Sequence, residues 1–188
     1  MAYPRNKIMD HLIKENICFV TTRLNRGLSS AYNFVSKNIL DLHLLDSAAD
    51  SLQAFPLYLY PNSNGQQSIS NTVKRTPNLN LLIVNKIAEV LELDFKDEST
   101  INGSLNQNKT FAPLDILDYI YCIVHSPKYQ IKFSEFLKKD YPKIPYPKDQ
   151  KTFWKLVKLG KEIREIHLLE SSKSEDYITS YPKGGDNK

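Results

Sequence analysis

The spacing of hydrophobic residues predicts amphipathic and buried helices along the chain. In residues 79–93 and 149–169, apolar side chains recur every three or four positions, which places them on one helical face. Residues 115–125 are apolar almost throughout, a pattern typical of a buried helix. Residues 5–15 and 129–139 each have one apolar face. Most of the predicted helical sequence therefore lies in the C-terminal half of the chain.

Three shorter segments, rich in β-branched and aromatic residues, predict strands. They cover residues 17–22, 32–36 and 55–61, and the last has prolines near its margins, where a missing hydrogen-bond donor is tolerated. Together with the helices, these strands predict an α+β fold. We expect a small mixed β-sheet with loops suited to recognition, and a C-terminal helical bundle.

The order of these elements divides the chain into three parts. Residues 1–112 are expected to form an α/β part, and residues 113–171 a helical part packed on it. Residues 172–188 are expected to form a flexible tail. Two long polar segments, 61–78 and 94–110, interrupt the first part, and loops of this length within a compact domain are usually functional or disordered.

The composition is that of a folded protein. The chain has 188 residues, of which 41% are hydrophobic and 24% charged, too apolar for a disordered chain. Its apolar runs are too short to span a membrane, and its first residues do not resemble a secretory signal. Cys18 and Cys122 both lie in apolar segments, which favours buried thiols in a reducing compartment. We therefore expect a cytoplasmic protein with no membrane partner.

Positive charge is concentrated in one part of the chain. The net charge is +4, but residues 126–164 alone hold eleven Lys and Arg against four Asp and Glu. Two polar segments, 23–30 and 62–75, combine cations with amide and hydroxyl side chains, the mixture that contacts phosphates and base edges. These features favour nucleic-acid binding, against the simpler interpretation that a basic helix face is only solvated.

Motifs of common catalytic sites are absent from the sequence. It has six glycines, isolated except for Gly184 and Gly185, so no glycine-rich phosphate loop or dinucleotide fingerprint can form. The G-x-S-x-G motif of serine hydrolases and the Asn-Pro-Pro-aromatic motif of amino-methyltransferases are both missing. We therefore expect no catalytic residue in this chain.

One group of residues could in principle bind a metal ion. Asp118, Cys122 and His125 would share one face of the helix predicted over residues 115–125. Zinc requires about four ligands, usually from two segments, and no second pair of Cys or His is available. We expect instead that Cys122 packs in the core and His125 ends the helix, so no metal site is predicted.

Several stretches, taken together and in order, resemble a known family. They are YPRNKIMDHL (3–12), FPLYLYP (55–61), DILDYIYCIVHSPKY (115–129), FLKKDYPKIP (136–145), and LG (159–160) with IHLLE (166–170). This set is similar to the C-terminal specificity domain of type ISP restriction-modification enzymes and of related adenine-specific DNA methyltransferases. The likeness extends from Tyr3 to about Ser171.

The resemblance implies a function in DNA target recognition. In that family the complete polypeptide joins a nuclease, a helicase-like motor and an amino-methyltransferase to this domain, which recognises the target sequence. The expected partners are double-stranded DNA and the linked methyltransferase and helicase–nuclease portion. The chain alone is then not an enzyme and needs no cofactor, whereas the linked methyltransferase would use S-adenosylmethionine. The alternative is a structural module that docks onto the methyltransferase without reading bases.

The resembling motifs are mostly apolar and are expected to form the scaffold, so base reading is assigned to the loops. Arg5 and Lys7 are expected to contact phosphates near the first helix, and the basic helices over residues 138–161 either hold the DNA backbone or face the catalytic portion. The complete set of predicted DNA contacts is Arg5, Lys7, Arg23, Asn25, Arg26, Lys74 and Arg75.

Overall fold

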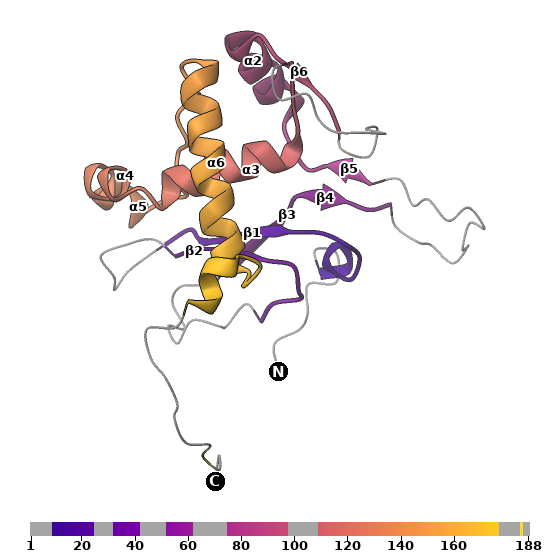
Figure 1. The fold of residues 1–188 in the computed structure, drawn as a ribbon, viewed down its shortest axis with the longest axis vertical. Helices are drawn as coiled ribbons and strands as arrows, with labels where there is room; N and C mark the ends of the chain where they lie inside the picture. Colours follow the sequence, from indigo (N-terminus) through magenta and orange to yellow (C-terminus); the bar gives the residue numbers. More distant parts are fainter. Residues whose placement is uncertain are drawn as a thin grey trace, which may run out of the picture.

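A computed structural model of the chain describes residues 9–24, 32–41, 52–61, 75–97, 109–176 and Gly185. Short strands in the first part are followed by longer helices in the second (Figure 1). In chain order the elements are η1 (Asp10–Leu12), β1 (Cys18–Thr22), β2 (Asn33–Ser36), β3 (Leu52–Pro56), β4 (Tyr58–Leu59), β5 (Thr76–Pro77), α2 (Leu81–Leu91), β6 (Asp94–Phe95), β7 (Thr110–Phe111), α3 (Pro113–Val124), α4 (Pro127–Lys132), α5 (Ser134–Leu137), α6 (Gln150–His167) and η3 (Ser172–Glu175). No described helix is both long enough and apolar enough to cross a bilayer.

The main sheet is antiparallel, with β1 between β2 and β3. Val20 of β1 lies opposite Phe34 on one side and Ala54 on the other. Cys18 and Val20 pack with Met9 and Leu12 on one face of the sheet. Neighbouring side chains of β1 point to the opposite face, which packs against α3. Both faces of β1 are therefore covered, which explains its continuous apolar sequence.

The remaining strands form two separate two-residue ladders. Tyr58 of β4 lies opposite Pro77 of β5 in an antiparallel pair. Asp94 of β6 lies opposite Thr110 of β7 in a parallel pair. The α+β class is confirmed, with the strands divided among three small sheets.

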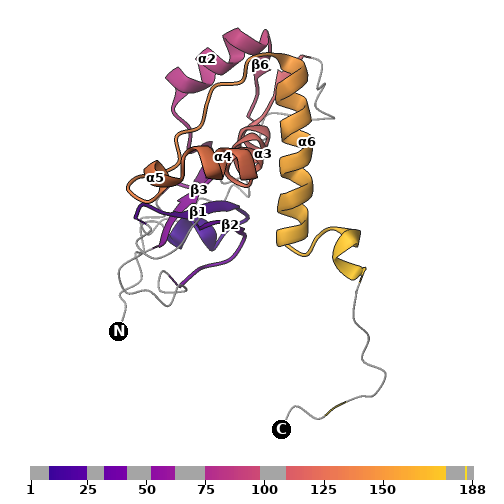
Figure 2. The same ribbon diagram turned by 90° about the vertical axis from the view of Figure 1, so that its left-hand side faces the viewer.

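Helix α3 lies at the centre of the molecule. Figure 2 shows it nearly end-on, beside α6 and above the main sheet. Its Ile116 and Tyr119 pack in a cluster that includes Val84 of α2 and Phe153 of α6. Its other side supplies residues such as Tyr121 to a second cluster with the sheet. One helix thus supports both hydrophobic cores.

The crossing of α3 and α6 depends on a glycine and a buried ion pair. A Cβ atom at Gly160 would lie 1.8 Å from the backbone oxygen of Asp118, so only glycine permits this approach. One turn further along α6, Nε of Arg164 donates to Oδ1 of Asp118 at 2.6 Å, and its second nitrogen donates to Oδ2 at 3.1 Å. Both side chains are almost completely buried. Burial raises the pKa of the Asp118 carboxyl, and the two hydrogen bonds from Arg164 oppose this rise.

The helices predicted over residues 79–93, 115–125 and 149–169 are confirmed, whereas the described part of the predicted helix 5–15 contains only the short 3-10 turn η1, and residues 129–139 also differ from the prediction. There the chain forms two short helices, α4 and α5, which are separated at Phe133, where φ is −111° and ψ is 17°. The predicted strand over residues 55–61 is also interrupted, at Leu57. Its backbone N–H leaves the ladder and donates to the carbonyl oxygen of Ile17 at 2.8 Å.

Some predictions fall partly outside the described residues. Of the predicted helix 5–15, the structure describes residues 9–15, which include η1. Within the predicted tail, Ser172–Glu175 form η3. The division at residues 112 and 171 stays a prediction.

We predict that Gly160→Ala destabilises the protein. Alanine in place of glycine inside a helix would by itself stabilise it by about 1 kcal/mol. The contact with Asp118 should reverse this sign, because forcing an extra methyl group into a well-packed contact typically costs about 1–3 kcal/mol. Urea unfolding of the variant measures the net change. Lys161→Ala, on the exposed side of the same helix, is the control and should change stability little. A more stable Gly160→Ala protein would contradict this view of the crossing.

Candidate nucleic-acid interface

The predicted DNA contacts are only partly described by the structure. Arg23 and Arg75 are placed, at the end of β1 and just before β5. The other predicted contacts lie outside the described residues; they are Arg5, Lys7, Asn25, Arg26 and Lys74.

Arg75 is held in a fixed position at the base of the β4–β5 hairpin. Its guanidinium lies over the ring of Tyr58, 3.9 Å from the centroid. One of its nitrogens donates to the carbonyl oxygen of Glu15 at 3.4 Å. Tyr58 is itself fixed, because Asn16 bonds to its backbone oxygen at 2.8 Å and to its backbone N–H at 3.1 Å. A cation stacked in this way is ordered before any ligand arrives.

A small polar pocket of about 220 Å³ adjoins Arg75. Lys37 and Arg164 also line it, and neither was predicted from the sequence. Each has an acidic partner, since Lys37 bonds to the carboxylate of Glu170 and Arg164 to that of Asp118. The cations of the pocket are therefore largely balanced by acids. The fold brings these residues together from separate elements, so no local sequence pattern could have indicated the pocket.

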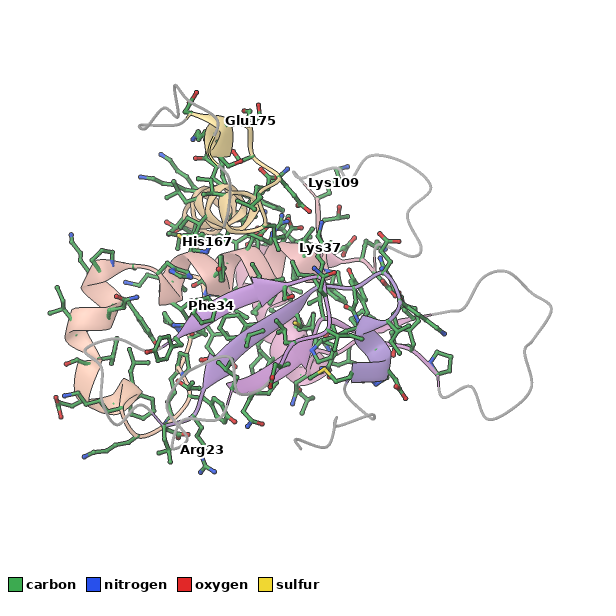
Figure 3. All side chains as sticks on the ribbon, turned by 90° about the horizontal axis from the view of Figure 1, so that it is seen from below. Arg23, Phe34, Lys37, Lys109, His167 and Glu175 are labelled. Carbon is green, nitrogen blue, oxygen red and sulfur yellow. The ribbon has the colours of Figure 1, made fainter. Side chains whose placement is uncertain are left out.

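Arg23 occupies a different part of the surface. Its side chain is 68% exposed, and its Nε lies 3.7 Å from Oδ1 of Asp140, a loose surface pair of small energetic value. Figure 3 shows Arg23 at one edge of the molecule, well separated from Lys37 of the polar pocket. Arg75 contacts the residues that precede β1, whereas Arg23 follows β1. The structure therefore does not join the two arginines in one patch.

The helical part has an extensive basic surface. On α6, the lysines of the N-terminal half are exposed, and the same is true of the lysines on α4 and of those that follow α5. The exposed lysines of this part are Lys128, Lys132, Lys138, Lys139, Lys143, Lys148, Lys151, Lys155, Lys158 and Lys161. Except for the buried Arg164, the positive charge of residues 126–164 thus lies on the solvent side of the helices.

An apolar groove of about 340 Å³ lies between α2, α3 and the extended segment before α6. Ile83, Ile144 and Tyr146 are among its lining residues. None of the lining residues carries a carboxylate, amine or imidazole. Leu81 and Leu82, beside it on α2, are 66% and 75% exposed. The only titratable groups that line the groove are the phenols of Tyr119 and Tyr146, so the groove suits an apolar partner.

Two histidines and a tyrosine meet where α3 and α6 end. A hydrogen bond of 2.6 Å joins the hydroxyl of Tyr121 to Nδ1 of His167, and the rings of His125 and His167 lie 5.2 Å apart. No described residue offers a hydrogen-bond partner to the buried Nε2 of His125. Burial, with a smaller contribution from His167, lowers the pKa of His125.

The possible metal ligands of α3 are not arranged as a metal site. Asp118 is paired with Arg164, and burial raises the pKa of the Cys122 thiol, which favours its neutral form. The part of the chain that the structure describes contains no group of three His, Cys, Asp or Glu side chains placed to hold an ion.

The family model of the Type ISP C-terminal specificity domain matches residues 1–188. The chain belongs to this family. None of the curated proteins compared with it matches.

Solved structures extend the comparison for this specificity domain. It is similar to part of the chain in the cryo-EM structure of a DrdV–DNA complex, with a TM-score of 0.61 and 18% identity over 89% of its length. A second similar structure is that of a nuclease-deletion mutant of the type ISP restriction-modification enzyme LlaGI in complex with a DNA substrate mimic. The match covers 82% of the specificity domain, with 18% identity and a TM-score of 0.48. The specificity domain spans 13% of the DrdV chain and 10% of the LlaGI chain. The DrdV likeness supports the same fold.

We predict that acid destabilises this specificity domain partly through His125. In the unfolded chain this histidine should titrate near its ordinary value of 6.5, whereas the pKa in the folded protein is lower. Between the two values the unfolded state binds more protons, so stability decreases as the pH falls from about 6.5 through the folded pKa.

The variant His125→Gln should lose this contribution, because glutamine stays neutral. Urea unfolding from about pH 7 to about pH 5 would then show a smaller decrease in stability for the variant than for the unaltered chain. Parallel pH profiles for the two proteins would show that His125 does not contribute.

Proposed function

We propose that this chain recognises a specific sequence in duplex DNA and directs a linked catalytic portion of a restriction-modification enzyme to that site. The observation that carries the proposal is membership of the specificity domain family over the whole chain. The DNA complexes of DrdV and LlaGI concern much longer chains, and we extend DNA binding to this one as part of the proposal.

The described surface has groups suited to both parts of this task. Arginine can form two hydrogen bonds with the edge of a guanine, and Arg75 is already ordered by Tyr58. Exposed lysines can hold phosphates without reading sequence. In this division a few residues read bases, and many exposed lysines contribute affinity through phosphate contacts.

The catalytic steps belong to the linked portion in this proposal. An adenine methyltransferase extracts its target base from the duplex and takes the methyl group from S-adenosylmethionine. This chain lacks the motif that grips such an adenine, so its own contribution is to fix the position of the DNA. A free-standing enzyme would need a pocket with converging titratable groups, and the polar pocket beside Arg75 has cations but pairs Lys37 and Arg164 with carboxylates.

A second candidate is a module that docks onto the catalytic portion without reading bases. The apolar groove favours this role, because Leu81 and Leu82 extend its apolar surface into solvent. The two roles can be separated by measuring DNA affinity. Recognition requires a preferred sequence and a steep dependence on salt, whereas a docking module would bind all duplexes equally and negligibly.

We predict that Arg75→Ala alters DNA binding by the chain. If Arg75 reads a base, the variant should lose about 5–150-fold in affinity for the preferred sequence and relax preference at one position. If it contacts a phosphate, all duplexes should weaken alike and the salt dependence should decrease. Competition binding against a set of duplexes at two salt concentrations distinguishes these outcomes.

Lys128→Ala, an exposed cation on α4, serves as a control for charge removal. The combined variant of Arg23, Arg26, Lys74 and Arg75 to alanine tests the surface as a whole. A combined variant that keeps both its preferred site and its affinity would exclude these residues as the recognition surface.

A further inference from the structure

Three lysines form a row along the exposed side of α6. Lys151, Lys155 and Lys158 follow one another at spacings of four and three residues, which places them on one helical face. All three are exposed, and the buried residues Phe153 and Val157 lie on the opposite side of the helix. We call these three lysines the lysine ridge.

The ridge differs from the C-terminal half of the same helix. There the cations have acidic partners: Lys161 lies 3.7 Å from Glu165, and Lys173 of η3 lies 3.3 Å from Glu162. Lys155 and Lys158 form no ion pair with any residue that the structure describes.

Asp149, the acid just before the ridge, caps the helix. Its carboxylate accepts the backbone N–H of Thr152 at 2.8 Å. The hydroxyl of Thr152 also donates to this carboxylate, at 2.9 Å. The two hydrogen bonds, with a smaller contribution from Lys151, lower the pKa of Asp149. The excess positive charge therefore lies on the N-terminal half of α6.

This charge distribution does not favour the helix itself. The N-terminal end of a helix carries a partial positive charge, so cations there are unfavourable, and the first turn of α6 contains no acidic residue. Like charges four residues apart also repel one another. A face that only had to be solvated would be more stable with acids interleaved among the lysines. A bound polyanion would relieve the repulsion.

The ridge is also held in a fixed position. The close contact of Gly160 with Asp118 and the buried Arg164–Asp118 pair fix α6 against α3. Figure 2 shows the N-terminal half of α6 beside α2, away from the main sheet that ends near Arg23. A ligand on the ridge would therefore contact a surface separate from Arg23, the predicted contact that follows β1.

We propose that Lys151, Lys155 and Lys158 bind the phosphate backbone of duplex DNA without reading its sequence. The identity of the polyanion as DNA rests on the proposed function, whereas the ridge itself rests on the charges and geometry of α6. Phosphate contacts of this kind release counterions, so they determine how steeply affinity falls with salt.

The test is the triple variant Lys151→Gln, Lys155→Gln, Lys158→Gln in the full 188-residue chain. Affinity for a duplex is measured over a range of salt beginning at about 50 mM. If each lysine neutralises one phosphate, the slope of log K against log salt should become shallower by about 2.7. Sequence preference should not change, and the melting temperature should stay equal or rise, since the repulsion is removed.

The matched control is Lys128→Gln, Lys132→Gln, Lys139→Gln, which removes the same charge from exposed positions on and beside α4 and α5. The proposal predicts that this control keeps the original slope. It is overturned if the ridge variant keeps the original slope, if both variants lower the slope equally, or if the unaltered chain does not bind duplex DNA at about 50 mM salt.

Failure of the proposed function would look different from failure of the ridge. A chain that binds all duplexes with the same affinity, but whose slope depends on the ridge, would support the ridge and contradict sequence recognition.

Discussion

The close crossing of α3 and α6 is the constraint on which the rest of the structure depends. Gly160 allows α6 to approach the backbone of Asp118, and this approach brings Arg164 into bidentate contact with the Asp118 carboxylate. A buried ion pair adds little net stability compared with apolar residues of the same shape, but the loss of one partner leaves a buried charge and is costly. The pair therefore contributes more to selecting one arrangement of the two helices than to the stability of that arrangement.

This crossing connects the functional surfaces through one rigid centre. Helix α3 packs against the main sheet on one side and against α2 and α6 on the other. The polar pocket near Arg75 is lined by Arg164, which belongs to the crossing itself. The lysine ridge lies on the far side of α6, and the apolar groove lies between α2 and α3. A chain that positions DNA relative to a separate catalytic portion needs surfaces with fixed mutual positions, and the crossing provides them.

The sequence predicts the helices well because their apolar spacing is strong, and it predicts contacts between distant residues poorly. No glycine or proline marks the break at Phe133, so two short helices look like one. The sequence left Asp118 without a predicted partner, because the residue that neutralises it, Arg164, is 46 positions away. The basic surface of α6 could be predicted from composition, whereas the stacking of Arg75 on Tyr58 depends on the pairing of β4 with β5. The motifs of the family resemblance include both Asp118 and Gly160, but they predicted only a scaffold and not the contact between these residues.

Our main proposal is that DNA contacts the cationic surfaces and does not enter the apolar groove. Hydrogen–deuterium exchange of the chain with and without duplex DNA tests this claim most directly. We expect slower exchange on DNA binding around Arg75 and in residues 150–158, with α2 unchanged. Slower exchange confined to α2 and the residues 144–146 beside it would contradict the account, because it would place the DNA on the apolar groove.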